Sequence, residues 1–398
     1  MLISNLYYLT YCTNIHPGEN WNVTFASLKT NLPTIKQRVS HNQDFGIGLR
    51  LSNKASEELG LEENLTEFKN WLAEHKLYVF TMNGFPYGNF HGEVVKDNVH
   101  EPDWTTKDRV NYTSRLFNQL NLLVPKGVSG GISTSPISYK HWFKTPSELT
   151  EAKRIGAENM LSIALQLFKN EEDHGNYLHL DIEPEPDGIL ENSSEVLDFF
   201  NEFLLPQGVV MFKNEFGFEK QKAIDLIKRY ITVCYDICHF SLAYEEPSET
   251  FQKFKKAGIL VGKIQVSAAL KILFDNENDD MVWDELAKFN EPTYLHQVTE
   301  YNEGVVKTHS DLPIVLENKK SVKELRAHFH VPIFLEKFTS LYSTQDHIIK
   351  TILYLKENQI CNHLEIETYT WEVLPKHLKK ELTESIVREI EWLKGQLT

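Results

Sequence analysis

Short apolar segments alternate with longer amphipathic segments along almost the whole chain, and this alternation is what most limits its possible folds. Eight of the apolar segments are rich in β-branched or aromatic residues and short enough to be strands, at 6–14, 45–51, 77–84, 128–136, 177–186, 231–241, 260–270 and 364–371. A helix-like pattern or a long loop follows each of them. Eight such units in one chain predict an α/β fold, a (β/α)₈ TIM barrel, in preference to a doubly wound sheet.

Two connections are longer than a barrel requires. Residues 85–107, after the third strand, are predicted to form a lid-like loop, because long loops in compact domains usually cover binding sites. Residues 274–344 contain two more strand-like segments, at 294–301 and 326–336, and are predicted to form an insertion before the eighth strand. The aromatic and imidazole side chains expected in the lid are Phe85, Tyr87, Phe90, His91 and Trp104. No linker rich in Gly, Ser or Pro divides the sequence, so residues 1–398 are predicted to be a single TIM-barrel domain.

Charge and composition exclude several classes of protein. The 41 Lys and Arg residues are outnumbered by 56 Asp and Glu residues, giving a net charge of −15 that argues against a nucleic-acid partner. The four cysteines are dispersed, as expected of a reduced protein and not of a disulfide framework. The first residues lack the features of a signal peptide, and no apolar run is long enough to span a membrane. We therefore expect a cytoplasmic protein.

Polar residues occur at the ends of most of the predicted strands, where the active site of a TIM barrel lies. In chain order they include Asn14, His16, Arg50, Asn83, Glu183, Glu185, Asp236, His239, Gln265 and Glu367. Acidic side chains from several strand ends would repel one another unless a cation lay between them. Oxygen and nitrogen donors of this kind suit Mn²⁺, Mg²⁺, Co²⁺ or Zn²⁺, so we predict a divalent metal site.

Each of these residues, taken alone, also has a structural explanation. Glu365 could be the partner in a buried salt bridge, and an H-x-H pair such as His328 and His330 is more often solvated than metal-bound. Residues two apart on a strand share one face, however, so both rings of this pair could point toward one site. The coincidence of polar residues across five strands favours a real polar site.

Three motifs resemble those of the xylose isomerase-like barrels, a superfamily that includes ketose epimerases and apurinic endonucleases. LDIEPEP resembles the Glu-Pro-Lys-Pro segment of xylose isomerases, with Glu183 at a metal-ligand position. Asp236-Ile-Cys-His239 resembles the D-x-x-H motif of the superfamily, and Glu367 is similar to the final glutamate ligand of the epimerases. Nearly the whole chain resembles the EboE family, barrel proteins of a bacterial operon for metabolite traffic. The matching segments are YCTNIHPGENW, FGIGLRLS, FTMNGFPYGNFHG, ISTSPISYK, HFHVPIF and LEIETYTWEVLP.

The resemblance implies a metal centre with some departures from the superfamily. Gln265 stands where the epimerases have a histidine ligand, and Glu185 stands where xylose isomerases have a lysine. The amide oxygen of Gln265 is a weaker ligand than imidazole, and a histidine of the insertion could supply the missing nitrogen. The predicted metal ligands are Glu183, Asp236, Gln265, Glu367, His239 and His330.

The resemblance and the polar residues together suggest a metal-dependent isomerase or epimerase acting on a sugar-like or polyol-like small molecule. Glu183 and Glu367 are the predicted acid–base pair. The residues predicted to bind substrate are His16, Arg50, Asn83, His91, Glu185, His239 and His328. Two alternatives stay open, namely a protein that binds a metabolite and passes it to other proteins of its operon, and a zinc-dependent phosphodiesterase of the endonuclease type.

Overall fold

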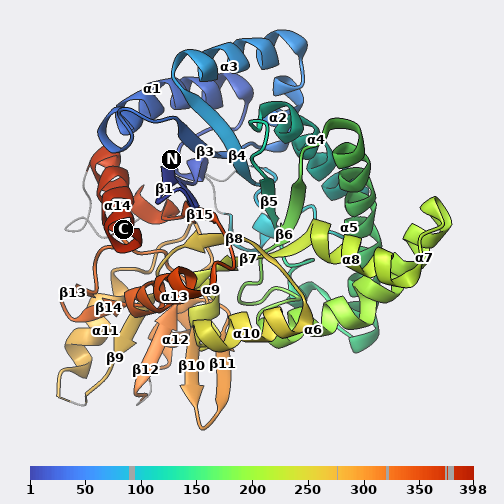
Figure 1. The fold of residues 1–398 in the computed structure, drawn as a ribbon. Coiled ribbons are helices and arrows are strands. Elements are labelled where there is room, and N and C mark those ends of the chain that lie inside the picture. Colours follow the sequence, from blue (N-terminus) through green and yellow to red (C-terminus); the bar gives the residue numbers. More distant parts are fainter. Residues whose placement is uncertain (89–94, 276, 320–321, 373, 375–380) are drawn as a thin grey trace.

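Eight parallel strands form a closed barrel in the computed structural model, which describes residues 1–398 except 89–94, 276, 320–321, 373 and 375–380 (Figure 1). The strands are β2 (Tyr7–Tyr11), β3 (Phe45–Arg50), β4 (Leu77–Asn83), β5 (Gly130–Thr134), β6 (Leu178–Ile182), β7 (Ile231–Asp236), β8 (Val261–Val266) and β15 (His363–Ile366). Each pairs in parallel with its neighbours in this order, and β15 pairs with β2. A parallel bridge between Cys12 and Gly48 joins β2 to β3 and closes the ring. The short strand β1 (Leu2–Ile3) is antiparallel to β2. The predicted (β/α)₈ barrel is confirmed.

Helices surround the barrel and bury their apolar faces against it (Figure 1). The longest, α5 (Pro146–His174), shows how the sequence sets their limits. A capping box between Thr145 and Glu148 begins it, and Gly175 ends it with a positive φ of 76°. The other helices around the barrel are α1 (Trp21–Val39), α2 (Asn53–Leu59), α3 (Glu62–Glu74), α4 (Lys107–Leu123), α6 (Ser193–Phe199), α7 (Leu205–Phe216), α8 (Lys220–Tyr230), α9 (Ile237–Leu242), α10 (Pro247–Ala257), α13 (Gln345–Asn358) and α14 (Leu382–Leu397). None of the helices in the described ranges is both long and apolar enough to cross a bilayer.

The predicted insertion folds as a second, antiparallel sheet beside the barrel (Figure 1). Its strands are β9 (Leu270–Leu273), β10 (Val298–Asn302), β11 (Val305–His309), β12 (Glu324–Ala327), β13 (Lys337–Phe338) and β14 (Leu341–Ser343), with α11 (Asp279–Ala287) and α12 (Leu312–Glu317) between them. The sheet begins with β9 at Leu270, which lies four residues before the predicted start of the insertion at residue 274. Only a short break in the strand separates β9 from β8. The predicted strand at 326–336 is wrong beyond Ala327, so His328 and His330 lie in the irregular segment that follows β12.

The predicted strand at 231–241 is also too long. The side chain of Asp236 accepts a hydrogen bond from the backbone N–H of His239 at 3.0 Å and begins α9, so the strand ends at Asp236. His239 therefore lies in the first turn of a helix and not on the strand. A hydrophobic pattern cannot distinguish these two cases over so few residues.

The interior of the barrel contains a buried ion pair. Lys263 on β8 contacts Glu365 on β15, and both side chains are fully buried. The structural explanation considered for Glu365, a buried salt bridge, is therefore correct. Gly48 on β3 leaves room for this pair, because a Cβ atom there would overlap Glu365 Oε1. Among the predicted lid residues, Trp104 belongs to the core instead: it is buried, and its ring N–H donates to Thr134 Oγ1 at 2.9 Å.

Candidate metal centre

A pocket opens where the barrel strands end, and three parts of the chain line it. The barrel contributes Asn14, Asn83, Glu183, Glu185, His239, Glu367 and Tyr369. The loop after β4 contributes Phe85, Pro86, Val95, Lys96, Val99 and His100, and the insertion contributes Tyr294, Leu295, Gln297, His328 and His330. The pocket is therefore polar at its floor and largely apolar where the loop after β4 covers it. Active sites of TIM barrels lie at this end.

Three carboxylates meet at this end of the barrel, and we call Glu183, Asp236 and Glu367 the carboxylate subsite; Glu183 and Glu367 line the pocket. Glu183 directly follows β6, Asp236 ends β7 and Glu367 directly follows β15. One carboxylate oxygen of each residue lies within 4.8 Å of an oxygen of the other two. All three are buried, with 2%, 0% and 4% exposure. Glu183 Oε2 and Asp236 Oδ2 have no hydrogen-bond partner among the described residues. Buried carboxylate oxygens without donors are costly unless a cation binds them, so this subsite fits a divalent metal ion.

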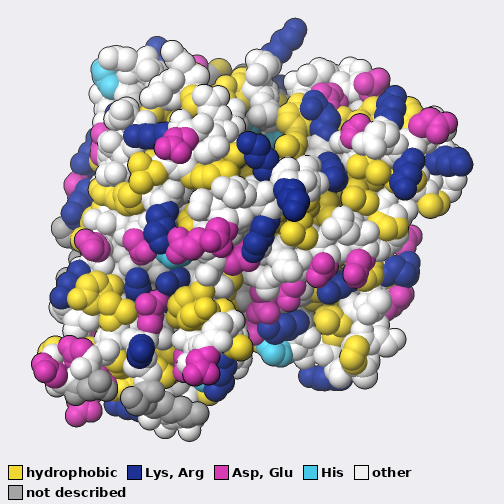
Figure 2. All heavy atoms as spheres, turned by 60° about the horizontal axis from the view of Figure 1, so that its bottom comes forward, with side chains coloured by type: hydrophobic (Ala, Val, Ile, Leu, Met, Phe, Trp, Pro, Cys, Tyr) yellow, Lys and Arg dark blue, Asp and Glu magenta, His cyan; other side chains and the backbone are white. Residues whose placement is uncertain are grey.

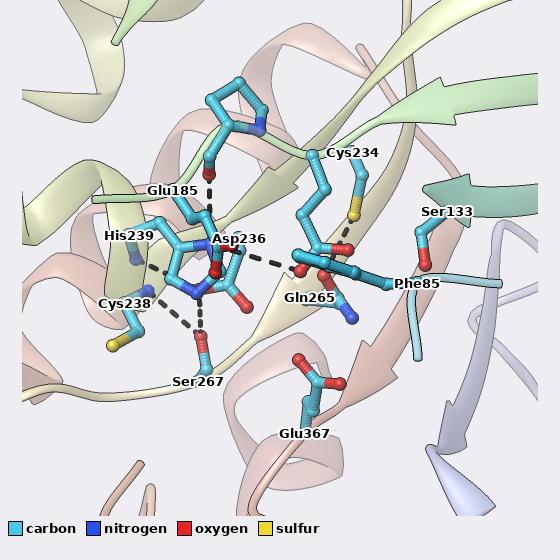
Figure 3. A network of polar contacts seen from close by, with 12 residues as sticks. Phe85, Ser133, Glu185, Cys234, Asp236, Cys238, His239, Gln265, Ser267 and Glu367 are labelled. Carbon is cyan, nitrogen blue, oxygen red and sulfur yellow. Dashed lines mark hydrogen bonds and ion pairs between the residues drawn. The ribbon is translucent and has the colours of Figure 1, made fainter. Parts of the chain in front are cut away.

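Neighbouring side chains hold the carboxylates in place. The amide groups of Asn14 and Asn83 each donate to Glu367 Oε1 at 2.8 Å. The hydroxyl of Ser267 donates to Asp236 Oδ1 at 2.7 Å, and Figure 3 shows this contact beside Glu367 and Gln265. These donors occupy one oxygen of Glu367 and one oxygen of Asp236 and orient the other oxygen of each. Such outer hydrogen bonds are typical of metal-ligating carboxylates.

The proton affinities of the two glutamates are strongly raised. Burial raises the pKa of Glu183 well above its usual value, and the carboxylates of Glu367 and Asp236 raise it further. Burial, followed by the charges of Asp236 and Glu365, does the same to the pKa of Glu367. Without a cation, the subsite would therefore bind protons more readily than exposed carboxylates do, and a bound metal would displace them.

Three histidines form a second group next to the carboxylates, and we call His239, His328 and His330 the histidine subsite. His239 comes from α9, whereas the other two follow β12 in the insertion. Ligand atoms of His239, His330 and Asp236 lie within 4.8 Å of one another, as do those of His239, His328 and Glu185. The insertion therefore brings imidazole nitrogens next to the barrel site. The roles of His330 as a metal ligand and of His328 as a substrate-binding residue stay predictions.

Other predicted residues lie away from the pocket. The guanidinium of Arg50 donates to the carbonyl oxygens of Gly18 and Gly88 and contacts Glu19. Arg50 therefore joins the loops that contain these residues. His16 Nε2 lies 2.8 Å from the hydroxyl of Tyr11. Neither is part of the pocket lining. His91 lies outside the described residues.

Gln265 is buried beside the carboxylate subsite, but its amide oxygen is engaged elsewhere. That oxygen accepts a hydrogen bond from the thiol of Cys234 at 3.0 Å, while its amide nitrogen has no partner among the described residues (Figure 3). If the amide group of Gln265 were rotated by half a turn, its oxygen and nitrogen would exchange places and the oxygen would point away from Cys234. Its assignment as a metal ligand stays a prediction.

Two further residues of the site were not predicted from the sequence. His100, in the loop after β4, places Nε2 at 3.0 Å from Glu185 Oε1, and both side chains are buried. Gln297 of the insertion contacts His328 Nδ1 at 2.8 Å through its amide oxygen. Neither residue belongs to a recognisable motif, and each reaches the site only through the packing of a long connection.

Comparison with known proteins supports the fold. No protein-family model and no curated protein matches the sequence. Among solved structures, a xylose isomerase-like TIM-barrel protein from Mycobacterium smegmatis in complex with magnesium has a TM-score of 0.52 at 9% identity, over 100% of this chain and 99% of that chain. The fold is that of a xylose isomerase-like TIM barrel.

Other solved structures of the same kind are similar at lower scores. The IolI protein with a bound zinc atom has a TM-score of 0.47 at 11% identity, and the probable 3-DHS dehydratase AsbF of Bacillus anthracis has 0.45 at 12%. Both matches cover 98% of each chain. At this level of identity, similarity to a xylose isomerase-like barrel establishes the architecture and no reaction.

Proposed function

We propose that this protein is a divalent-metal-dependent isomerase or epimerase that acts on an uncharged sugar-like or polyol-like molecule. The observation that carries the proposal is the carboxylate subsite, where three buried carboxylates with two unpartnered oxygens meet, two of them lining the pocket. Mn²⁺, Mg²⁺, Co²⁺ and Zn²⁺ are the candidate ions. The magnesium and zinc named for the similar barrels support a metal of this class.

The residues of the pocket have separate tasks in this proposal. A divalent ion held by Glu183, Asp236 and Glu367 would supply Lewis acidity, which polarises a substrate carbonyl. Asn14 and Asn83 fix Glu367, and its raised pKa suits an exchange of protons with a substrate carbon or hydroxyl. Glu183 is our candidate for the complementary proton transfer. The lining residues His100 and Glu185 contact each other and would orient substrate hydroxyl groups.

The charge of the pocket favours an uncharged substrate over a phosphorylated one. Lys96 is the only Lys or Arg that lines the pocket among the residues the structure describes. Its ammonium group lies 2.7 Å from Asp311 Oδ2, so its charge is already compensated. Phosphate recognition usually needs uncompensated cations or several N–H donors. A phosphodiester or sugar phosphate is therefore disfavoured.

A binding and transfer protein is the second candidate, and the apolar wall of the pocket favours it. Phe85, Val95, Val99 and Leu295 line the same space as the carboxylates and could bind an apolar part of a metabolite. This function agrees with the proposed relationship to the EboE family, with a place in metabolite traffic and with operon-encoded partners in the cytoplasm.

Metal analysis tests the site first. Chelator-stripped protein, dialysed against Mn²⁺, should retain Mn²⁺, and Glu183→Gln and Asp236→Asn should each lower its affinity at least tenfold. Glu389→Gln is the matched control, because Glu389 is an equally buried carboxyl group outside the subsite. Unchanged affinity in both site variants would show that the ligands are wrong.

Hydrogen exchange then separates the two functions. An isomerase or epimerase with an acid–base pair should incorporate solvent deuterium at the carbon next to a carbonyl of its substrate, which NMR detects for a panel of ketoses and polyols. Glu367→Gln should abolish the exchange. Tight binding of a ligand without any exchange would instead establish the transfer function.

A further inference from the structure

One side of the pocket is built from apolar side chains that belong neither to the strands nor to the helices of the barrel. They come from the loop after β4 and from the insertion, and they line the same space as Glu183 and Glu367. We call five of these lining residues the apolar wall: Phe85, Val95, Val99, Tyr294 and Leu295.

Part of the apolar wall forms a hydrophobic cluster of its own. Val95 and Tyr294 are buried and pack with Val99 and Tyr369, apart from the continuous core that joins the helices to the barrel. Apolar surface that lines a cavity instead of filling the core is covered best by an apolar partner inside the cavity. The wall is therefore suited to binding and is not needed to hold the barrel together.

The wall is fixed in place by contacts between the loop and the insertion. The carbonyl oxygen of Thr293 accepts hydrogen bonds from the backbone N–H groups of Val95 at 2.9 Å and of Lys96 at 3.3 Å. The ammonium group of Lys96 lies 2.7 Å from Asp311 Oδ2. A surface that is held in this way is preformed, so a ligand binds it without ordering the loop first.

Much of the hydrogen-bonding capacity of the pocket is already used within the protein. Asn14 and Asn83 donate to Glu367 Oε1, and Gln297 contacts a backbone carbonyl oxygen and His328 Nδ1. Among the lining residues that the structure describes, polar recognition is therefore concentrated near the carboxylate subsite and not spread around the pocket.

This arrangement discriminates between two kinds of substrate. A sugar carries a hydroxyl group on nearly every carbon, and some of these groups would lie against the apolar wall, where they would lose water without gaining a partner. A molecule with its oxygen atoms at one end places them at the carboxylate subsite and buries its other end on the wall. The second kind satisfies both sides of the pocket.

We infer that the molecule bound by this pocket is a small hydroxy-ketone or hydroxy-aldehyde with an alkyl or aryl body, and not a fully hydroxylated sugar. Its oxygen atoms lie at the carboxylate subsite, and its body lies on the apolar wall. The inference rests on the proposed function for the role of the oxygen atoms, and it narrows the sugar-like substrates to those with an apolar substituent.

Binding of three matched compounds to the full chain, measured by NMR titration in the presence of Mg²⁺, tests the inference. Erythrulose and 1-hydroxy-2-butanone share a hydroxy-ketone head and a four-carbon chain, but erythrulose has two more hydroxyl groups. 1-Hydroxy-2-hexanone adds two methylene groups to the butanone. We expect the hexanone to bind roughly tenfold more tightly than the butanone, because each buried methylene contributes about a fourfold gain, and erythrulose to bind most weakly.

Variants of the wall show whether the gain arises there. Val99 and Leu295 are half-buried, so Val99→Thr and Leu295→Asn should fold, which circular dichroism checks. Each should weaken binding of the hexanone about fivefold and leave that of erythrulose unchanged. Val210→Thr is the matched control, because Val210 is 58% exposed on α7 and does not line the pocket. It should leave the binding of all three compounds unchanged.

Erythrulose binding as tightly as the hexanone would overturn the inference, and so would binding of none of the three compounds or a hexanone affinity that both wall variants leave unchanged. Failure of the proposed function looks different. If the hexanone binds through the wall but no metal is retained and no hydrogen exchanges, the apolar recognition stands and the isomerase proposal fails. If erythrulose binds most tightly and exchanges hydrogen with solvent, the isomerase proposal stands and the inference fails.

Discussion

Glu389 shows what a single buried acid does to a protein. Its carboxyl group on α14 accepts hydrogen bonds from the Thr368 hydroxyl at 2.8 Å and from the backbone N–H of Ile333 at 3.1 Å. Burial raises its pKa to about 8, more than these hydrogen bonds lower it. The side chain therefore enters the folded protein as a neutral acid, and it joins the end of β15 to the insertion without carrying a charge.

The raised pKa of Glu389 makes stability depend on pH. Between the unfolded pKa of about 4.3 and the folded pKa of about 8, the folded state holds a proton that the unfolded state has released. The free energy of unfolding therefore falls as pH rises, by up to about 1.4 kcal/mol per unit from this group. Glu389→Gln, which resembles the neutral acid, should be close to wild type at pH 5 and more stable at pH 8. Denaturant unfolding at both pH values measures this difference, and a constant difference would contradict the assigned pKa.

Gly48 lies where the neighbouring side chain leaves no room for a Cβ atom. A methyl group at this position would overlap the Glu365 carboxylate, which is held by Lys263 and cannot move freely. We expect Gly48→Ala to destabilise the protein by about 1–3 kcal/mol, as overpacked cores do. Gly395→Ala is the control: nothing lies within 4 Å of the added carbon, and α14 should gain up to about 1 kcal/mol. Thermal melting of both variants gives the comparison, and equal effects would contradict the steric argument.

At the scale of elements, a buried ion pair joins strands of the barrel in addition to the backbone hydrogen bonds between them. Lys263 and Glu365 lie on the neighbouring strands β8 and β15, and Lys263 Nζ also lies 3.3 Å from Ser133 Oγ on β5. TIM-barrel interiors are usually filled by Val, Ile and Leu. An ion pair here is tolerated because each charge has its counter-charge within contact distance.

The energetics of this pair are testable by a double-mutant cycle. Lys263→Met leaves Glu365 buried without its cation and should cost about 3–5 kcal/mol. The double variant Lys263→Met and Glu365→Leu should recover most of that loss, because an apolar pair removes the buried charge. Urea unfolding of the two single variants and the double variant measures the coupling. Additive losses would show that the two side chains do not stabilise each other.

At the scale of the whole molecule, an excess of acidic residues sets the net charge. On the face shown in Figure 2, Lys and Arg side chains are interspersed with Asp and Glu side chains. The net charge of −15 adds a repulsion toward polyanions. That the protein does not bind nucleic acid stays a prediction from this charge.

Metal binding should stabilise the whole chain, because an ion that binds only the folded state shifts the unfolding equilibrium. A concentration one hundred times the dissociation constant adds about 2.7 kcal/mol to the free energy of unfolding. For a chain of this length that corresponds to a rise in Tm of about 3 °C. Scanning calorimetry with and without Mn²⁺ measures the shift, which Asp236→Asn should abolish. A shift of equal size in that variant would place the stabilising ion elsewhere.

The sequence by itself determined the barrel and the location of its polar residues. The alternation of apolar and amphipathic segments is a local property that fixes which strands form, and the direction of parallel strands places their ends on one side. Glu183, Asp236 and Glu367 could be assigned in this way because each stands at the end of its strand. Element limits were less predictable: a side-chain cap at Asp236 turned the end of a predicted strand into a helix.

Only the tertiary structure decided how residues from distant parts of the chain meet. His328 and His330 reach His239 because the insertion sheet packs against the barrel, and His100 reaches Glu185 because the loop after β4 folds over the pocket. Arg50, by contrast, is engaged by backbone carbonyl groups of two loops. These contacts depend on packing between segments tens of residues or more apart, which no periodicity in the sequence encodes.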